Sequence, residues 1–123
     1  MSSANAAGVD TGGLFAAIDA KDAAAFVAYL TEDAIFRFGS APPVQGRDAI
    51  QAAVDGFFAT IAGCSHSISN TLRQDDTLVC EGVVSYRRHD GSEIALPFTD
   101  VFEYDGGLIA HYKIYMDVGP LYA

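Results

Sequence analysis

Residues 93–103 read EIALPFTDVFE, with a hydrophobic side chain at four of the five even-numbered positions. This two-residue period is typical of a β-strand with one face turned to the interior. In a strand, every second residue points to the same face, and the even-numbered face of this stretch has one carboxylate among hydrophobic side chains. That face is therefore expected to meet a core or a cavity. Because an unpaired buried charge is costly, Asp100 is predicted either to be paired or to serve chemistry. The five residues of this face are Ile94, Leu96, Phe98, Asp100 and Phe102.

The second half of the chain predicts four strands, at residues 64–73, 77–88, 93–104 and 108–117. Short Asp- and Gly-rich sequences separate them and are typical of hairpin turns, so neighbouring strands should be antiparallel. These turns are Asp75-Asp76, Asp90-Gly91 and Asp105-Gly106-Gly107.

The first half of the chain predicts mainly helix. Residues 14–31 are Ala-rich and amphipathic, and Lys21 and Asp22 are expected to divide them into two short helices, with Asp22 as an N-cap. Residues 34–38 predict a short strand, and residues 48–62 give the clearest helix. Helices followed by a run of strands indicate an α+β domain with helices packed on one face of a curved sheet.

Length and charge limit the classes of function. The 123 residues suit one domain at 14–123, preceded by a flexible tail at 1–13. The net charge of −9, with only seven Lys and Arg, argues against nucleic acid and anionic membranes as partners. The apolar runs are too short to span a membrane and no leader pattern is present, so a cytoplasmic location is expected.

No metal or cofactor is expected. Cys64 and Cys80 show no ligand-like spacing to a histidine and are interpreted as reduced thiols. His66, His89 and His111 are scattered along the chain, so no ligand cluster is predicted. No Gly-rich junction between a strand and a helix is present that could hold a phosphate.

The expected strand registers place a pocket around Asp100. Turns centred near residues 75, 91 and 106 put Gly82 on one side of Asp100 and Tyr112 on the other, provided that no β-bulge intervenes. In the same registers, the next set of residues opposite one another across the four strands would be His66, Val84, Phe98 and Ile114. The same face would also carry Ile68, Tyr86, Leu96 and Met116. The outer face would carry Ser65, Ser67, Glu81, Ser85, Arg87, Thr99, Glu103, His111, Lys113, Tyr115 and Asp117, with Asp117 capping the C-terminal turn.

Each polar pocket residue has two interpretations. Gly82 marks either a bend or bulge, or open space for a ligand. His66 would start roughly 10 Å from Asp100, two strands away, and is either a core histidine or a ligand contact. Tyr112 either satisfies the buried acid or shares a proton with it. Desolvation should raise the pKa of Asp100, which suits a general acid.

Residues 31–47 (TEDAIFRFGSAPPVQGR) and 107–121 (GLIAHYKIYMDVGPL) resemble the SnoaL-like branch of the nuclear transport factor 2-like superfamily, over about residues 14–121. The resemblance implies a cone-shaped, cystatin-like α+β roll. In this fold a strongly curved, mostly antiparallel sheet wraps around three N-terminal helices and a ligand pocket. It also implies a homodimer formed through the outer sheet face. The fold hosts isomerases, cyclases, dehydratases, epoxide hydrolases and non-enzymatic binders, so it does not define the activity.

Catalytic positions of known relatives transfer only in part. Asp100 matches the protonated aspartic acid of ketosteroid isomerase, but the positions of its base and its tyrosine fall near Phe38 and Leu14. Steroid isomerisation by that route is therefore not expected. The machinery of limonene epoxide hydrolase is excluded in the same way, because its catalytic positions fall on Phe36, Phe38, Gly82, Val84 and Ile114. Positions that line its cavity match Phe15, Ile18, Phe57, Ile61, His66, Tyr86, Leu96, Phe98 and Met116.

Three functions remain open. The first is an enzyme that isomerises, cyclises or dehydrates a small apolar molecule, with Asp100 as acid/base assisted by His66 and Tyr112. The second is a non-catalytic binder of a hydrophobic metabolite, and the third is an interaction module whose pocket is simply its core. The predicted ligand lining is Phe15, Ile18, Phe36, Phe38, Phe57, Ile61, Gly82, Val84, Tyr86, Leu96, Phe98, Ile114 and Met116.

Overall fold

The computed structural model describes residues 11–123, and most of the predicted tail at 1–13 lies outside the described residues. The first helix already begins at Thr11, two residues before the expected end of that tail. The elements in chain order are α1 (Thr11–Asp19), α2 (Ala23–Val27), β1 (Leu30–Phe38), β2 (Val44–Gln45), α3 (Arg47–Ala59), β3 (Gly63–Gln74), β4 (Thr77–Arg87), β5 (Glu93–Asp105), β6 (Leu108–Tyr115) and α4 (Gly119–Tyr122).

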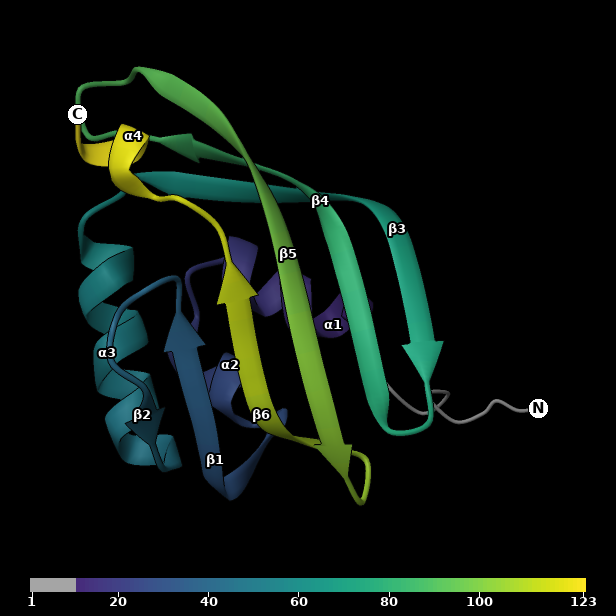
Figure 1. Cartoon of the computed structure of the whole chain (residues 1–123). Coiled ribbons are helices and arrows are strands. Elements are labelled where there is room, and N and C mark those ends of the chain that lie inside the picture. The colour runs from purple at the N-terminus through teal and green to yellow at the C-terminus, as the bar shows by residue number, and fades with distance from the viewer. Residues whose placement is uncertain (1–10) are drawn as a thin grey trace.

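The described strands form one curved sheet in the order β2-β1-β6-β5-β4-β3. Only the pairing of β1 with β6 is parallel, and the consecutive strands β3 to β6 are joined by antiparallel hairpins. Figure 1 shows the long strands bent around one side of the molecule, with α1, α2 and α3 on the concave side. The predicted α+β architecture with helices on one face is confirmed. Among the described residues, no helix is long and apolar enough to cross a membrane.

The N-terminal helices are divided at the predicted point. The Asp22 side chain accepts a hydrogen bond from the Ala25 backbone N–H at 3.0 Å, as an N-cap does. Lys21 adopts a left-handed conformation with φ 57°, which breaks the helical path. The expected helix to residue 31 was too long, because Leu30 already pairs with Ile109 in the sheet. Pairing with β6 therefore overrides the local helical pattern at that point.

The predicted faces of the hairpins are correct, but two registers are wrong. His66 pairs with Val84 as expected, whereas Asp100 pairs with Cys80 and Ile114 instead of Gly82 and Tyr112. The turn between β4 and β5 is centred one residue earlier than expected, and a bulge interrupts the pairing of β5 and β6 between residues 103 and 104. An error of one residue in a turn centre moves each pairing by two residues. The side chains therefore keep their faces while their neighbours change.

Gly82 lies where two backbones approach closely. It pairs with Ile68 on one side and Phe98 on the other, beside a register shift in β3 between Ile68 and Asn70. A Cβ atom at Gly82 would come within 2.0 Å of the Ser67 carbonyl oxygen. The bulge interpretation of Gly82 is therefore correct, and the interpretation as open space for a ligand is wrong.

The outer face of the sheet carries polar residues, as the alternation predicted. Ser65, Ser67 and Glu81 are exposed, and Lys113 forms an ion pair with Glu103 at 2.6 Å. Asp117 accepts a hydrogen bond from the Gly119 backbone N–H at 2.9 Å, so it holds the turn that leads into α4, whose N-cap residue is Val118. This agrees with its predicted role at the C-terminal turn.

Candidate functional site

A cavity of about 310 Å³ lies between the helices and the inner face of the sheet. Eight Phe and Tyr side chains, from α2, α3, β1, β4, β5 and β6, contribute to its wall. The predicted catalytic residues Asp100, His66 and Tyr112 all border it. Of the predicted ligand lining, Ile18, Phe36, Phe38, Phe57, Tyr86, Phe98, Ile114 and Met116 border it as well.

The structure places five residues of the predicted lining elsewhere. Phe15 lies behind the cavity wall, where its ring packs on the His66 ring with centroids 5.1 Å apart. Ile61, Val84 and Leu96 are buried in the hydrophobic core, and Gly82 lies against the backbone of β3. The alternation along a strand places a residue on the inner face, but it does not tell whether that residue meets the cavity or another side chain.

Asp100 is the single charged residue among the buried residues that the structure describes, and it is 2% exposed. Its Oδ1 atom is buried without a hydrogen-bond partner among the described residues. Burial raises the pKa of Asp100 to about 8, although hydrogen bonding to Tyr112 opposes part of that rise. At neutral pH the carboxyl is therefore mostly protonated and can donate a hydrogen bond or a proton into the cavity.

Tyr112 adjoins Asp100 diagonally rather than directly across the ladder. It pairs with Phe102 on β5, and the two rings pack edge to face with centroids 4.6 Å apart. The Tyr112 side chain is 1% exposed, and burial, followed by the charge of Asp100, raises its pKa well above the usual value. Its phenol therefore remains neutral and can act as a hydrogen-bond donor.

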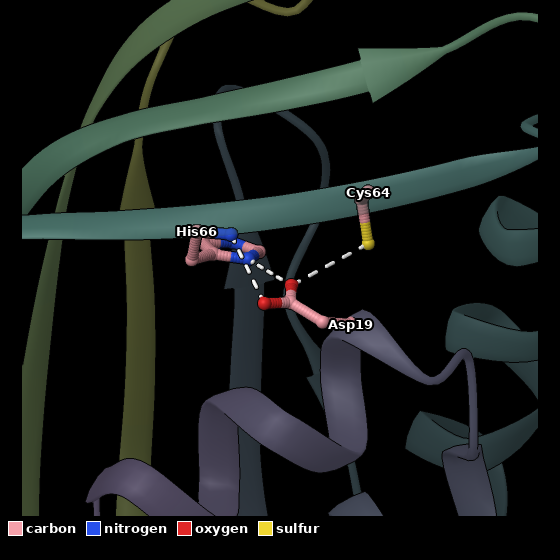
Figure 2. Close-up of side chains that lie close together, drawn as sticks. All are labelled: Asp19, Cys64 and His66. Carbon is pink, nitrogen blue, oxygen red and sulfur yellow. Dashed lines mark hydrogen bonds and ion pairs between the residues drawn. The ribbon is translucent and has the colours of Figure 1, made fainter.

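His66 is held by an aspartate that the sequence analysis missed. Asp19, the last residue of α1, accepts from the backbone N–H of His66 at 3.0 Å, and its Oδ1 lies 2.6 Å from His66 Nδ1 (Figure 2). A carboxylate at Nδ1 favours the tautomer with the proton on that nitrogen, which leaves Nε2 with its lone pair. No spacing signal links residues 47 positions apart, so only the packing of α1 on β3 brings them together.

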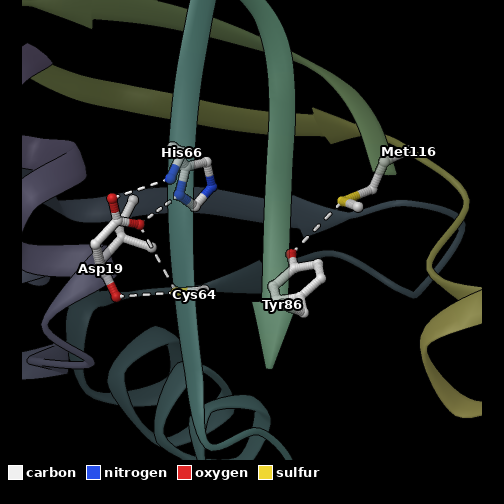
Figure 3. A network of polar contacts seen from close by, with 6 residues as sticks. Asp19, Cys64, His66, Tyr86 and Met116 are labelled. Carbon is white, nitrogen blue, oxygen red and sulfur yellow. Dashed lines mark hydrogen bonds and ion pairs between the residues drawn. The ribbon is translucent and has the colours of Figure 1, made fainter. Parts of the chain in front are cut away.

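The His66 ring is fixed in orientation by its surroundings. It packs against Phe15 on one side and against Phe98 at 5.2 Å in an edge-to-face arrangement. Figure 3 shows that the ring nitrogen not bonded to Asp19 points away from it. His66 therefore presents a defined acceptor at the cavity wall. The His66 ring is thus hydrogen-bonded to a side chain rather than to backbone, and its contact with a ligand stays a prediction.

Cys64 joins the same cluster. Its Sγ lies 3.5 Å from the Ile18 carbonyl oxygen and 3.8 Å from Asp19 Oδ1. Burial, reinforced by the charge of Asp19, raises the pKa of the Cys64 thiol to about 12, so the thiol stays protonated at neutral pH. Potential ligand atoms of Asp19, Cys64 and His66 all lie within 4.8 Å of one another. The prediction that no cluster of potential metal ligands forms is therefore wrong, whereas the expected absence of a metal stays a prediction.

A second cavity adjoins the first across this cluster. Its volume is about 340 Å³, and both cavities are bordered by Cys64 and Tyr86. The Tyr86 hydroxyl contacts the Met116 sulfur at 3.9 Å, as Figure 3 shows, and burial raises the Tyr86 pKa. Cys64 and Tyr86 thus form part of the wall between the two cavities.

The fold matches solved structures of the nuclear transport factor 2-like class. A protein of unknown function from Burkholderia pseudomallei superposes with a TM-score of 0.81 at 15% identity, covering 90% of each chain. A putative SnoaL-like polyketide cyclase from Jannaschia sp. gives 0.79 at 14% identity, with 91% of this chain and 85% of that chain covered. TerC, co-crystallised with polyporic acid, gives 0.79 at 13% identity, with 91% and 92% covered.

Within that class, a model of the SnoaL-like domain matches residues 12–112, so the chain belongs to the SnoaL-like family. Structures with this fold include putative SnoaL-like polyketide cyclases, a hypothetical protein with a ketosteroid isomerase-like fold and an LEH-like epoxide hydrolase. No curated protein matches the sequence significantly. The family resemblance noted in the sequence is confirmed.

Proposed function

We propose that the protein is an enzyme that moves a proton on a small, apolar, carbonyl-containing molecule, with Asp100 as the acid/base group. The observation that carries this proposal is the buried, unpaired Oδ1 of Asp100 at the wall of an apolar cavity. A neutral carboxyl there can donate a hydrogen bond to a substrate oxygen, because no described residue forms a hydrogen bond with Oδ1. A buried polar atom without a hydrogen-bond partner destabilises the fold, and a bound substrate would supply the hydrogen bond that Oδ1 lacks.

His66 supplies an acceptor for the proton that leaves the substrate. The contact between His66 Nδ1 and Asp19 favours the tautomer that carries its proton on Nδ1 and leaves Nε2 unprotonated. An acceptor and a donor at one cavity suit the movement of a proton from carbon to oxygen, as in isomerisation, cyclisation or dehydration. Tyr112 assists by donating toward Asp100 or toward the same substrate oxygen.

The cavity walls support an apolar, ring-containing substrate. Rings of Phe36, Phe38, Phe57, Tyr86 and Phe98 surround the space, and the volume of about 310 Å³ lies at the lower end of the roughly 300–1,000 Å³ typical of ligand pockets. A flat, ring-containing compound with one or two oxygens fits this lining. An open cavity also argues against an interaction module whose pocket is filled by its own core.

The test measures proton exchange directly. The purified protein would be incubated in D₂O with cyclic ketones and alkyl hydroxyaryl ketones, which carry hydrogen on the carbon next to the carbonyl, and deuterium uptake at that carbon would be followed by mass spectrometry. We expect the wild type to accelerate exchange for at least one compound. Asp100→Asn should lower that rate by at least about tenfold, since general acid–base groups contribute about 10²–10⁴.

Glu103→Gln is the matched control, because Glu103 lies on the same strand but on the outer face, paired with Lys113. Its exchange rate should equal that of the wild type. Exchange that is undiminished in Asp100→Asn would refute the role of Asp100. Tight binding without exchange of any compound would instead favour the non-catalytic binder.

A further inference from the structure

We propose that Asp19, Cys64 and His66 form a binding site for a thiophilic divalent cation, with Zn²⁺ as the best match. The three side chains offer an oxygen, a sulfur and a nitrogen, which is the donor set that zinc takes in proteins. The site shares His66 with the proposed function, but the argument for zinc binding does not depend on that function.

The local structure explains why these three groups meet. Cys64 and His66 are two positions apart on β3, so their side chains share the inner face of the strand. Asp19 ends α1, and its carboxylate accepts from the backbone N–H of His66, which fixes the helix end over that point of the strand. The ligand set is therefore held by a rigid strand and a helix terminus rather than by loops.

Two of the three separations between the ligand atoms can be compared with those of a tetrahedral site. Zinc–ligand bonds of about 2.0–2.3 Å place neighbouring ligand atoms about 3.3–3.6 Å apart. Cys64 Sγ lies 3.8 Å from Asp19 Oδ1, while His66 Nδ1 lies 2.6 Å from the same oxygen. A cation entering between the imidazole and the carboxylate needs that pair to open by under about 1 Å, which rotation of the Asp19 side chain supplies.

The charges and the access suit a cation. A carboxylate and a thiolate together neutralise a divalent ion, and the thiol gives up its proton to solvent as the metal–sulfur bond forms. Cys64 and His66 border the cavity of about 310 Å³, and Asp19 and Cys64 border the one of about 340 Å³. Three protein ligands beside open space leave a fourth position for water or another small ligand.

Metal binding would change what His66 can do. Coordination through Nδ1 moves the imidazole proton to Nε2, the nitrogen that the proposed function uses as an acceptor. The bound cation would thus remove that acceptor from the cavity. Asp100 is not one of the three ligands and would keep its place.

Zinc binding can be measured without any substrate. The metal-free wild type would be titrated with ZnCl₂ by calorimetry, and with CoCl₂ while thiolate-to-cobalt charge-transfer absorption is recorded. We expect one Zn²⁺ per chain and a charge-transfer band. Cys64→Ala should weaken zinc at least about tenfold and abolish the band, because it removes the sulfur ligand.

Cys80→Ala is the matched control, because Cys80 is the other free thiol and does not belong to the proposed site. It lies opposite Asp100 in the ladder of β4 and β5. Cys80→Ala should bind zinc as the wild type does and keep the cobalt band. Wild-type affinity in Cys64→Ala would overturn the proposal by showing that zinc binds elsewhere on the chain. If Cys64→Ala does not fold, the cobalt spectrum of Cys80→Ala decides, since Cys64 is then the remaining thiol and absence of the band refutes the site.

Discussion

The wild-type protein is expected to lose about 4 kcal/mol more unfolding free energy than Asp100→Asn when the pH rises from 5 to 8.5, from the shift of the Asp100 pKa. The folded-state pKa is raised from 3.8 to about 8. Between these values the folded protein keeps a proton that the unfolded chain has released, so stability falls as the pH rises. Above about 8 both states are ionised, and the decline from this group ends.

Urea unfolding at several pH values checks this result, with the difference between wild type and Asp100→Asn isolating the one carboxyl. Asparagine keeps the size of the side chain and cannot ionise. Glu103→Gln is again the control: burial does not raise the Glu103 pKa overall, because its hydrogen bond with Lys113 lowers it. The unfolding free energy of Glu103→Gln should change with pH as that of the wild type does between pH 5 and 8.5. Parallel curves for wild type and Asp100→Asn would show that Asp100 titrates normally.

Gly82→Ala is expected to destabilise the fold by about 3 kcal/mol or more, because overpacking against backbone cannot be relieved by a rotamer change. The added methyl carbon would lie 2.0 Å from the Ser67 carbonyl oxygen and 2.9 Å from its carbon. Relief requires β3 and β4 to separate at the bulge, with loss of ladder hydrogen bonds. Chemical denaturation would measure the effect, and circular dichroism would show whether the variant folds.

Gly56→Ala adds the same methyl group where nothing lies within 4 Å, on the exposed side of α3. Alanine favours a helix interior, so this variant should gain about 0.5–1 kcal/mol. The two variants should therefore move stability in opposite directions. A loss in Gly82→Ala no larger than a few tenths of a kcal/mol would contradict the close approach of the two strands.

Much of the fold could be predicted from local signals. The turn sequences at 75–76, 90–91 and 105–107 separate the four long strands close to where they lie, and the Asp22 cap divides α1 from α2. Strand β2, with two residues, and the start of β1 at Leu30 carry no such signal. Both depend on pairing with other parts of the sheet.

The site could be predicted only in part. Alternation placed Asp100, His66 and Tyr112 on the inner face, and all three border the cavity. The partner of His66 could not be found in this way, because Asp19 belongs to a helix 47 residues earlier. Alternation could have placed Cys64 beside His66 on the same strand face, but not Asp19 with them, since that contact arises where α1 ends over β3.

The sequence shows which residues of an uninterrupted strand face inward, because the two-residue period of a strand is a property of the local backbone. It also determined the class of fold, through the order of helices, strands and turns. Tertiary structure decided which inward residues touch one another. A turn centred one residue earlier placed Cys80, not Gly82, beside Asp100, and a bulge in β3 closed the space at Gly82. Contacts between distant segments depend on registers and packing that no local pattern encodes, and those contacts make the cavity and the Asp19–His66 pair.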